Sequence, residues 1–137
     1  MSNSSDRRLE SRTKQFTLSI IHLYAQLPKS TVAQLLGRQV LRSGTLVGAQ
    51  DREAMRAKSI ADFISKIEGS LQEIEETRYW LDLLVESRTV SQSSVEDVRS
   101  EAGQPVAMLV ASVRTAKKQT PKVVAQAILH LSLCAYH

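Results

Sequence analysis

The amino-acid sequence predicts an all-α protein that folds as an up-down-up-down four-helix bundle. Apolar residues make up 42% of the chain and recur at spacings of three and four over four long segments, as in helices with one buried face. Aromatic residues make up only 4%, and the 137 residues include five Gly and three Pro. This length suits one domain with a core of its own. Short connections between the segments favour antiparallel packing of consecutive helices.

The first expected helix begins near Leu9 and ends near Gln26, within a bundle domain expected over residues 9–119. Pro28 stops this helix, because the residue before a proline avoids helical geometry. Residues 1–8 are small, polar and charged, so we expect them to be disordered. The predicted buried face of the helix consists of Leu9, Thr13, Phe16, Ile20, Leu23 and Leu27.

The second expected helix begins after a cap at Ser30 or Thr31 and ends between Asp51 and Lys58. No proline interrupts the chain between these points. The predicted apolar stripe of this helix consists of Val32, Leu35, Leu36, Val40, Ser43, Val47 and Ala54.

Three glycines, Gly37, Gly44 and Gly48, lie inside this second helix. A glycine in a helix interior costs about 0.8–1 kcal/mol relative to alanine, so three of them indicate a structural reason. They share one stripe of the helix with Leu41, which allows another backbone to come close. We therefore predict that they form a helix-packing contact or an oligomer contact. The alternative is a helix that breaks at Gly44, with a loop around Gly48.

A cap residue and a polar linker predict the bounds of the third and fourth helices. Ser59 can cap the third helix, and residues 87–94 form the linker that follows it. The fourth helix is expected to begin within this linker, at or after Ser91, and to end near residue 118. Gly103 and Pro105 fall inside it, and a proline in a helix interior costs about 3 kcal/mol. We expect a kink or a break there.

Residues 120–137 form an apolar tail that follows the predicted bundle. After Thr120-Pro121, the residues are mostly Val, Ala, Ile and Leu, with one charged side chain. The tail is too short to span a membrane. It either covers a groove, adds to an oligomer interface or is disordered, and the residues alone do not decide between these.

The sequence indicates a cytoplasmic protein with no membrane contact. No stretch of about 18 apolar residues is present to form a transmembrane helix. The polar N-terminus lacks the apolar run of a signal peptide. Cys134 is the only cysteine, so no internal disulfide can form, which suits a reducing compartment.

Basic residues are concentrated in the first half of the chain. Residues 1–58 hold ten Lys or Arg and four Asp or Glu, whereas residues 59–90 hold three and seven. Helical spacing places four arginines of the second helix on one ridge, here named the arginine ridge: Arg38, Arg42, Arg52 and Arg56. Thr45 and Ala49 lie in its middle. Guanidinium groups pair bidentately with phosphates, so the ridge could follow a nucleic-acid backbone.

The alternative is that the arginine ridge pairs within the chain and contacts no ligand. The third helix offers carboxylates for such pairing: Glu68, Glu75, Glu76 and Asp82. Basic and acidic helices would then neutralise each other inside one bundle.

Catalytic, cofactor and metal sites are not expected. His22, His130 and His137 are scattered, and no carboxylate stands at ligand spacing from them. The Glu-x-x-His pairs that build di-metal sites in bundles are missing, as are a P-loop and a dinucleotide-binding glycine motif. We therefore expect a protein that is not an enzyme.

Tyr79 and Trp80, near the end of the third helix, are the only adjacent aromatic residues. On a helix, one must lean toward the core and the other outward. We predict either a plug at the end of the bundle or an oligomer contact, since both residue types are enriched at interfaces.

Four segments carry a resemblance to a known family: Ser43–Ala54 (SGTLVGAQDREA), Lys58–Ile67, Glu73–Leu84 with its Tyr-Trp-Leu, and Leu109–Lys117. Over about residues 10–119, the chain resembles the bacterial four-helix bundle proteins first noticed as products of intervening sequences in large-subunit ribosomal RNA genes. The same family includes the accessory variability proteins of diversity-generating retroelements.

The resemblance implies an up-down bundle that assembles as a cyclic homopentamer. It also implies that a basic surface binds RNA or DNA and a reverse transcriptase partner, as in the retroelement members, and that no residue is catalytic. The chain departs from the family pattern at Leu46, at Gln50 and over residues 101–105, where Gly103 and Pro105 weaken the helix. The tail after Pro121 has no family counterpart, so the assembly stays open.

Overall fold

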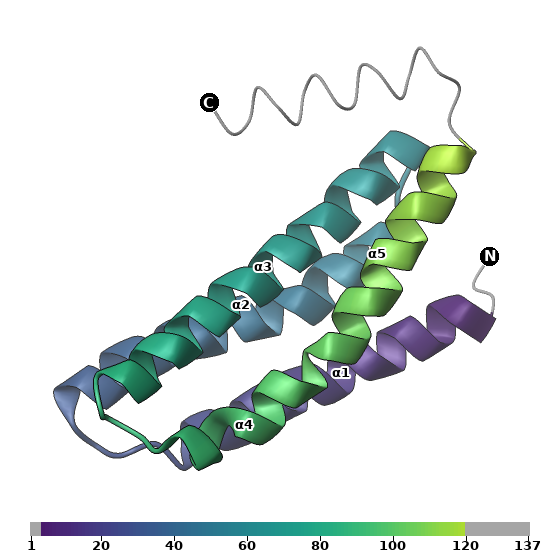
Figure 1. The fold of residues 1–137 in the computed structure, drawn as a ribbon. Coiled ribbons are helices and arrows are strands. Elements are labelled where there is room, and N and C mark those ends of the chain that lie inside the picture. Colours follow the sequence, from purple (N-terminus) through teal and green to yellow (C-terminus); the bar gives the residue numbers. More distant parts are fainter. Residues whose placement is uncertain (1–3, 120–137) are drawn as a thin grey trace.

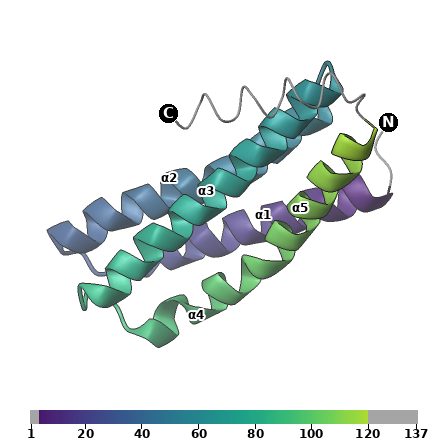
Figure 2. The same cartoon turned by 45° about the horizontal axis from the view of Figure 1, so that its top comes forward.

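The chain folds into an antiparallel bundle of four helical rods, the last of which is divided in two (Figure 1). The structure is a computed structural model that describes residues 4–119. Consecutive rods run in opposite directions, and both views show the same arrangement (Figures 1 and 2). The helices are α1 (Ser4–Ala25), α2 (Thr31–Met55), α3 (Ile60–Glu86), α4 (Gln92–Glu101) and α5 (Gly103–Lys118). The predicted all-α class and the four-helix bundle are confirmed.

The predicted caps set the starts of α2 and α3. Ser30 Oγ accepts a hydrogen bond from the backbone N–H of Ala33 at 3.2 Å. Ser59 Oγ accepts one from the N–H of Asp62 at 3.0 Å, and the Asp62 carboxylate accepts one from the N–H of Lys58 at 3.2 Å. These bonds satisfy backbone donors that have no partner inside the helix, which is why both helices start where the sequence indicates.

Helix α1 begins earlier than the sequence predicts. Residues 4–8, expected to be disordered, are helical, and α1 starts at Ser4 rather than near Leu9. Asp6 lies in the first turn, where a carboxylate suits the positive end of the helix dipole. Leu9 is fully buried, so the polar residues before it extend a helix that is already anchored.

The buried face of α2 also differs from the prediction at its start. Val32 and Leu35 were expected in the core, but they are 50% and 61% exposed. The buried positions belong instead to smaller or polar residues: Ala33, Gly37, Val40, Ser43, Gly44, Val47, Asp51 and Ala54. The close approach of α1 fixes which side of α2 faces inward, and this approach selects small side chains over Val32 and Leu35.

The three glycines of α2 face α1, and α2 runs unbroken through all of them. A Cβ on Gly44 would lie 2.7 Å from Ile20 Cγ1, and one on Gly37 would lie 2.4 Å from Leu27 Cδ1. At Gly48 the nearest atom, Thr17 Oγ1, would be 3.3 Å away. At Gly44, where three carbons of Ile20 lie against the backbone, glycine is required for close packing of the two helices, and the alternative break there does not occur.

The fourth rod breaks at Ala102, where α4 ends and α5 begins, as Gly103 and Pro105 predict. Pro105 has no N–H to donate, so the ladder resumes with Val106 N–H donating to Ala102 O at 3.2 Å. Val98, Ala102 and Pro105 are all buried, so packing continues across the break. The predicted tail, residues 120–137, and residues 1–3 lie outside the described part of the chain.

Candidate nucleic-acid interface

Because α2 is continuous, the arginine ridge lies along its outward side, with Thr45 and Ala49 at its middle. All four arginines are exposed. The ridge runs from Arg38 in α2 to Arg56, the C-cap that directly follows Met55, a span of 18 residues or about 27 Å at the rise of a helix. The ridge is therefore a long, nearly straight row of cations on one rigid element.

The two inner arginines are held by carboxylates of the neighbouring helices. Arg42 Nη2 forms an ion pair with Glu76 Oε1 of α3. Arg52 Nη2 pairs with Glu10 Oε1 of α1 at 3.1 Å. The Arg42 and Arg52 side chains remain 47% and 59% exposed, so both guanidinium groups can still meet a ligand. Surface ion pairs of this kind contribute about 0–1 kcal/mol. Exchanging the carboxylate partner for a phosphate therefore costs little.

The two outer arginines are exposed and form no ion pair with any residue of the described range 4–119. Arg38 lies one turn before Arg42, and Arg56 caps the C-terminal end of α2. These two cations lie at opposite ends of the ridge, and no carboxylate in the described part of the chain pairs with them.

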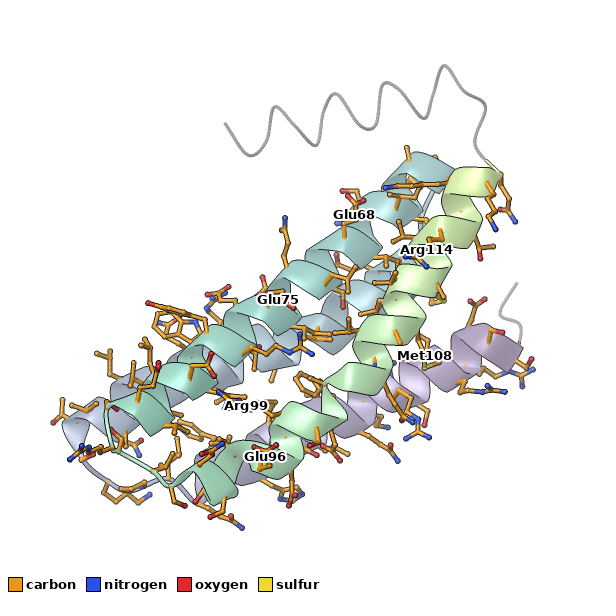
Figure 3. All side chains as sticks on the ribbon, viewed as in Figure 1. Glu68, Glu75, Glu96, Arg99, Met108 and Arg114 are labelled. Carbon is orange, nitrogen blue, oxygen red and sulfur yellow. The ribbon has the colours of Figure 1, made fainter. Side chains whose placement is uncertain are left out.

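Two of the four α3 carboxylates considered in the sequence pair with α4 or α5 rather than with the arginine ridge. Glu68 pairs with Lys117 Nζ at 3.4 Å, and Asp82 pairs with Arg99, which reaches from α4 toward α3 in Figure 3. Glu75, also labelled there, pairs with Arg78 of its own helix at 2.8 Å. Of the four carboxylates considered in the sequence, only Glu76 therefore pairs with the ridge. Among residues 4–119, ion pairs account for Arg42 and Arg52 of the ridge and not for Arg38 and Arg56.

Glu76 is the centre of a small polar cluster between α2 and α3. Its Oε1 accepts a hydrogen bond from Trp80 Nε1 at 3.2 Å and also pairs with Arg42. Partial burial raises the pKa of Glu76, but the bonds from Trp80 and Arg42 outweigh this and hold its pKa below the ordinary value. One turn away, burial and the charge of Glu76 raise the pKa of Glu73, whose Oε2 is buried without a hydrogen bond. Sequence reasoning missed Glu73.

Tyr79 and Trp80 point in different directions, as the helical geometry requires. Tyr79 is 56% exposed, while Trp80 is half-buried against the core. Their rings meet edge to face with centroids 5.1 Å apart. The hydrogen bond to Glu76 thus holds Trp80 in place, whereas Tyr79 is exposed on the surface. An oligomer contact through Tyr79 stays a prediction.

Several large apolar side chains are exposed on the outside of the first two helices. Sequence reasoning assigned no role to Leu18 and Ile21 of α1, and it placed Val32 and Leu35 in the core. The helical spacing already left Leu18 and Ile21 off the predicted buried face of the first helix, whereas it placed Val32 and Leu35 on the wrong side of α2. Together they leave apolar surface that suits contact with another chain.

Asp51 lies beneath the ridge and was not singled out from the sequence. It is fully buried between α1 and α2, and Thr13 Oγ1 donates a hydrogen bond to its Oδ2 at 3.1 Å. Its Oδ1 is buried without a partner. Burial raises the pKa of Asp51 to about 6, an effect that the Thr13 bond opposes and the charge of Glu10 reinforces.

The described residues contain no group of three His, Cys, Asp or Glu side chains placed to hold a metal ion. His22 is exposed on α1, and His130 and His137 lie outside the described range. A search of residues 4–119 also finds no helix with the length and apolarity needed to cross a membrane.

Comparison with known proteins identifies the family of this chain. The model of the 23S rRNA-intervening sequence protein family matches residues 6–111, which is most of the chain. The chain belongs to this family. The 23S rRNA-intervening sequence family was the one that the Ser-Gly-Thr and Tyr-Trp-Leu segments resembled, so that resemblance is confirmed.

A solved structure agrees with this membership in the 23S rRNA-intervening sequence family. The chain is similar to a protein of unknown function from the S23 ribosomal protein family of Bacteroides thetaiotaomicron, with 32% identity and a TM-score of 0.75. The match covers 80% of this chain and 98% of the other. No curated protein sequence matches the chain. Membership therefore supports the bundle fold and brings no assigned activity.

Proposed function

We propose that this 23S rRNA-intervening sequence family protein is a non-enzymatic, homo-oligomeric bundle that binds nucleic acid along the arginine ridge. The observation that carries the proposal is the exposed row of four arginines, three on the unbroken helix α2 and one at its C-cap. Arg38 and Arg56 are unpaired within residues 4–119, and Arg42 and Arg52 are held in place by weak surface pairs.

Binding of this kind contacts phosphates rather than bases. A rigid helix carrying guanidinium groups matches a polyanion by charge and spacing, with no aromatic residue in the ridge to stack on a base. RNA and DNA should therefore bind with little preference for sequence. With four phosphates neutralised, the logarithm of the association constant should fall with the logarithm of salt concentration with a slope of about −3 to −4.

Oligomerisation would repeat the ridge and raise the avidity of binding. We propose a cyclic homopentamer and a reverse transcriptase partner, following the retroelement proteins that the sequence resembles. Leu18, Ile21, Leu35 and Tyr79 support an assembly, because they leave large apolar side chains on the surface of a single chain. The predicted partners are thus a second copy, RNA or DNA, and a reverse transcriptase.

A second candidate function is an oligomeric scaffold that contacts no nucleic acid. The pairs Arg42–Glu76 and Arg52–Glu10 favour it, because they give half of the ridge a role inside the bundle. This candidate leaves Arg38 and Arg56 without a role, which is why we place it second.

The test replaces the whole ridge, Arg38, Arg42, Arg52 and Arg56, by Gln and measures fluorescence anisotropy of labelled RNA and DNA over a salt series. We expect at least about tenfold weaker binding and a nearly flat salt dependence. A matched variant, with Lys29, Arg88, Arg114 and Lys118 replaced by Gln, removes the same charge elsewhere and should bind much more tightly than the ridge variant. Light scattering on both checks the oligomer against the 15.2 kDa chain. Unchanged binding by a folded ridge variant would favour the scaffold.

A further inference from the structure

An aromatic pair on α3, Tyr79 and Trp80, lies beside the arginine ridge. Tyr79 is 56% exposed, and its ring meets the partly buried Trp80 ring edge to face, with centroids 5.1 Å apart. Trp80 Nε1 donates a hydrogen bond to Glu76 Oε1 at 3.2 Å, and the same oxygen pairs with Arg42 of α2. One carboxylate oxygen therefore bridges the aromatic pair and a guanidinium group of the ridge. The ridge has no aromatic residue of its own, and the neighbouring helix supplies two.

Arg42 is held beside the aromatic pair without losing its capacity to bind a phosphate. Its Nε donates a hydrogen bond to Gln39 Oε1 at 3.3 Å, and its Nη2 pairs with Glu76. These two contacts fix the plane of the guanidinium group, which carries further N–H donors. The Arg42 side chain is 47% exposed, so a phosphate oxygen can reach those donors. A phosphate bound there lies next to Trp80 and Tyr79.

A fixed cation next to an exposed aromatic ring suits a single-stranded nucleic acid. A base of a single strand can leave its own stack and lie on an aromatic side chain while its phosphate meets a cation. Such stacking strengthens binding by about tenfold per base. In a duplex the bases are paired and stacked inside, so only the phosphates meet the ridge and the aromatic pair adds nothing.

Resting on the proposed function, we infer that the aromatic pair stacks an unpaired base of a strand whose phosphate binds Arg42. Single-stranded RNA or DNA then gains affinity that a duplex does not. Tyr79 differs from Leu18 and Ile21, which are also exposed, because it offers a flat π face and its partner ring is bridged to a ridge arginine. The inference therefore assigns Tyr79 to the strand and leaves the aliphatic side chains to the assembly.

The test compares two labelled strands of equal length, each long enough to span the ridge: oligo-dT and a strand of abasic sites, which has the same phosphates and no bases. By fluorescence anisotropy, the wild type should bind oligo-dT about tenfold more tightly than the abasic strand. Tyr79→Ser should remove most of this difference without changing the affinity for the abasic strand, and Tyr79→Phe should keep it. Serine and tyrosine have similar helix propensities, so the substitution preserves α3.

Leu18→Ser is the matched control, because it removes an apolar side chain that is 46% exposed on α1. It should keep the full difference between the strands. Equal binding of oligo-dT and the abasic strand by the wild type, or a full difference in Tyr79→Ser, overturns the inference and leaves the ridge as a phosphate site. If neither strand binds, the proposed function fails as well. If light scattering shows a smaller assembly for Tyr79→Ser than for the wild type, Tyr79 contacts a second copy and the inference is wrong.

A second measurement needs no substitution. Trp80 is the only tryptophan of the chain, so the tryptophan emission reports on the aromatic pair alone. At saturation, oligo-dT should quench this emission more strongly than the abasic strand, because only oligo-dT brings a base onto the rings. Equal quenching by the two strands would show that no base reaches the pair.

Discussion

The two sides of the bundle are joined in different ways. Helices α1 and α2 approach closely through glycines and buried polar groups, with Gly44 against Ile20 and Asp51 bonded to Thr13. On the other side, α3 packs on α4 and α5 around apolar core residues, and the polar contacts at the edge are partly exposed ion pairs such as Glu68–Lys117. The glycines and polar groups of the first contact are closely packed and desolvated, whereas the ion pairs of the second are screened by water. Changes at the first should therefore be felt much more strongly.

The largest expected effect in the α1–α2 contact is at Asp51. Its pKa is raised from 3.8 to about 6, so the folded state holds a proton that the unfolded state releases between these values. Stability should therefore fall as pH rises from about 4 to about 6 and stay low above that. Asp51→Asn removes this loss and should raise the free energy of unfolding at pH 7.5 by up to about 3 kcal/mol.

Urea denaturation of the wild type and of Asp51→Asn at pH 4 and pH 7.5 measures this effect. The gain should be small at pH 4, where the wild-type carboxyl is already mostly neutral in the fold. A variant less stable than the wild type at pH 7.5 would mean that the ionised carboxylate is needed between the helices.

The next effect is a single methyl group on Gly44. Gly44→Ala places a Cβ 2.7 Å from Ile20 Cγ1, and we expect a loss of about 1–3 kcal/mol through overpacking, despite the better helix propensity of alanine. Gly103→Ala is the matched control, because no atom lies within 4 Å of the added Cβ. It should stabilise the protein by about 0.5–1 kcal/mol. Chemical denaturation gives the change in the free energy of unfolding for both variants. If both substitutions stabilised the protein, or both destabilised it, Gly44 would not be more tightly packed than Gly103.

The smallest effect is expected on the α3–α5 side. Lys117→Gln removes the pair with Glu68, whose N–O distance is 3.4 Å and whose side chains are 40% and 34% exposed. The melting temperature should change by an amount equivalent to less than about 1 kcal/mol, and the change should shrink further in high salt. Thermal unfolding at low and high salt measures this. A loss as large as that of Gly44→Ala would show that solvent does not screen the Glu68–Lys117 ion pair.

Much of the fold could be predicted because its signals are local. Ser30 and Ser59 fix helix starts through bonds to backbone three residues away, and Pro105 disrupts its own helix. The exposure of Val32 and Leu35 could not be predicted. Which side of α2 faces inward depends on how closely α1 approaches, and that is decided by contacts between residues far apart in the sequence.

The same limit applies to the candidate site. The spacing of the arginines places them on one ridge, and the continuous helix keeps them there. The partners of Arg42 and Arg52 depend on which helix lies on each side of α2, and spacing within α2 holds no such information. The buried carboxyl of Asp51 was missed for a related reason, since a charged residue on a helix normally indicates a solvated face.

The division of the arginine ridge into free ends and a paired centre has a consequence for ligand length. The two arginines that form no ion pair within residues 4–119, Arg38 and Arg56, lie at opposite ends of the ridge, with Thr45 and Ala49 between them. These two arginines are about 27 Å apart, the length of about eight base steps at 3.4 Å each. A mononucleotide or a very short oligonucleotide reaches only one of them, whereas a longer strand spans both. Under the proposed function, a strand shorter than about eight base steps should therefore bind more weakly than a longer one.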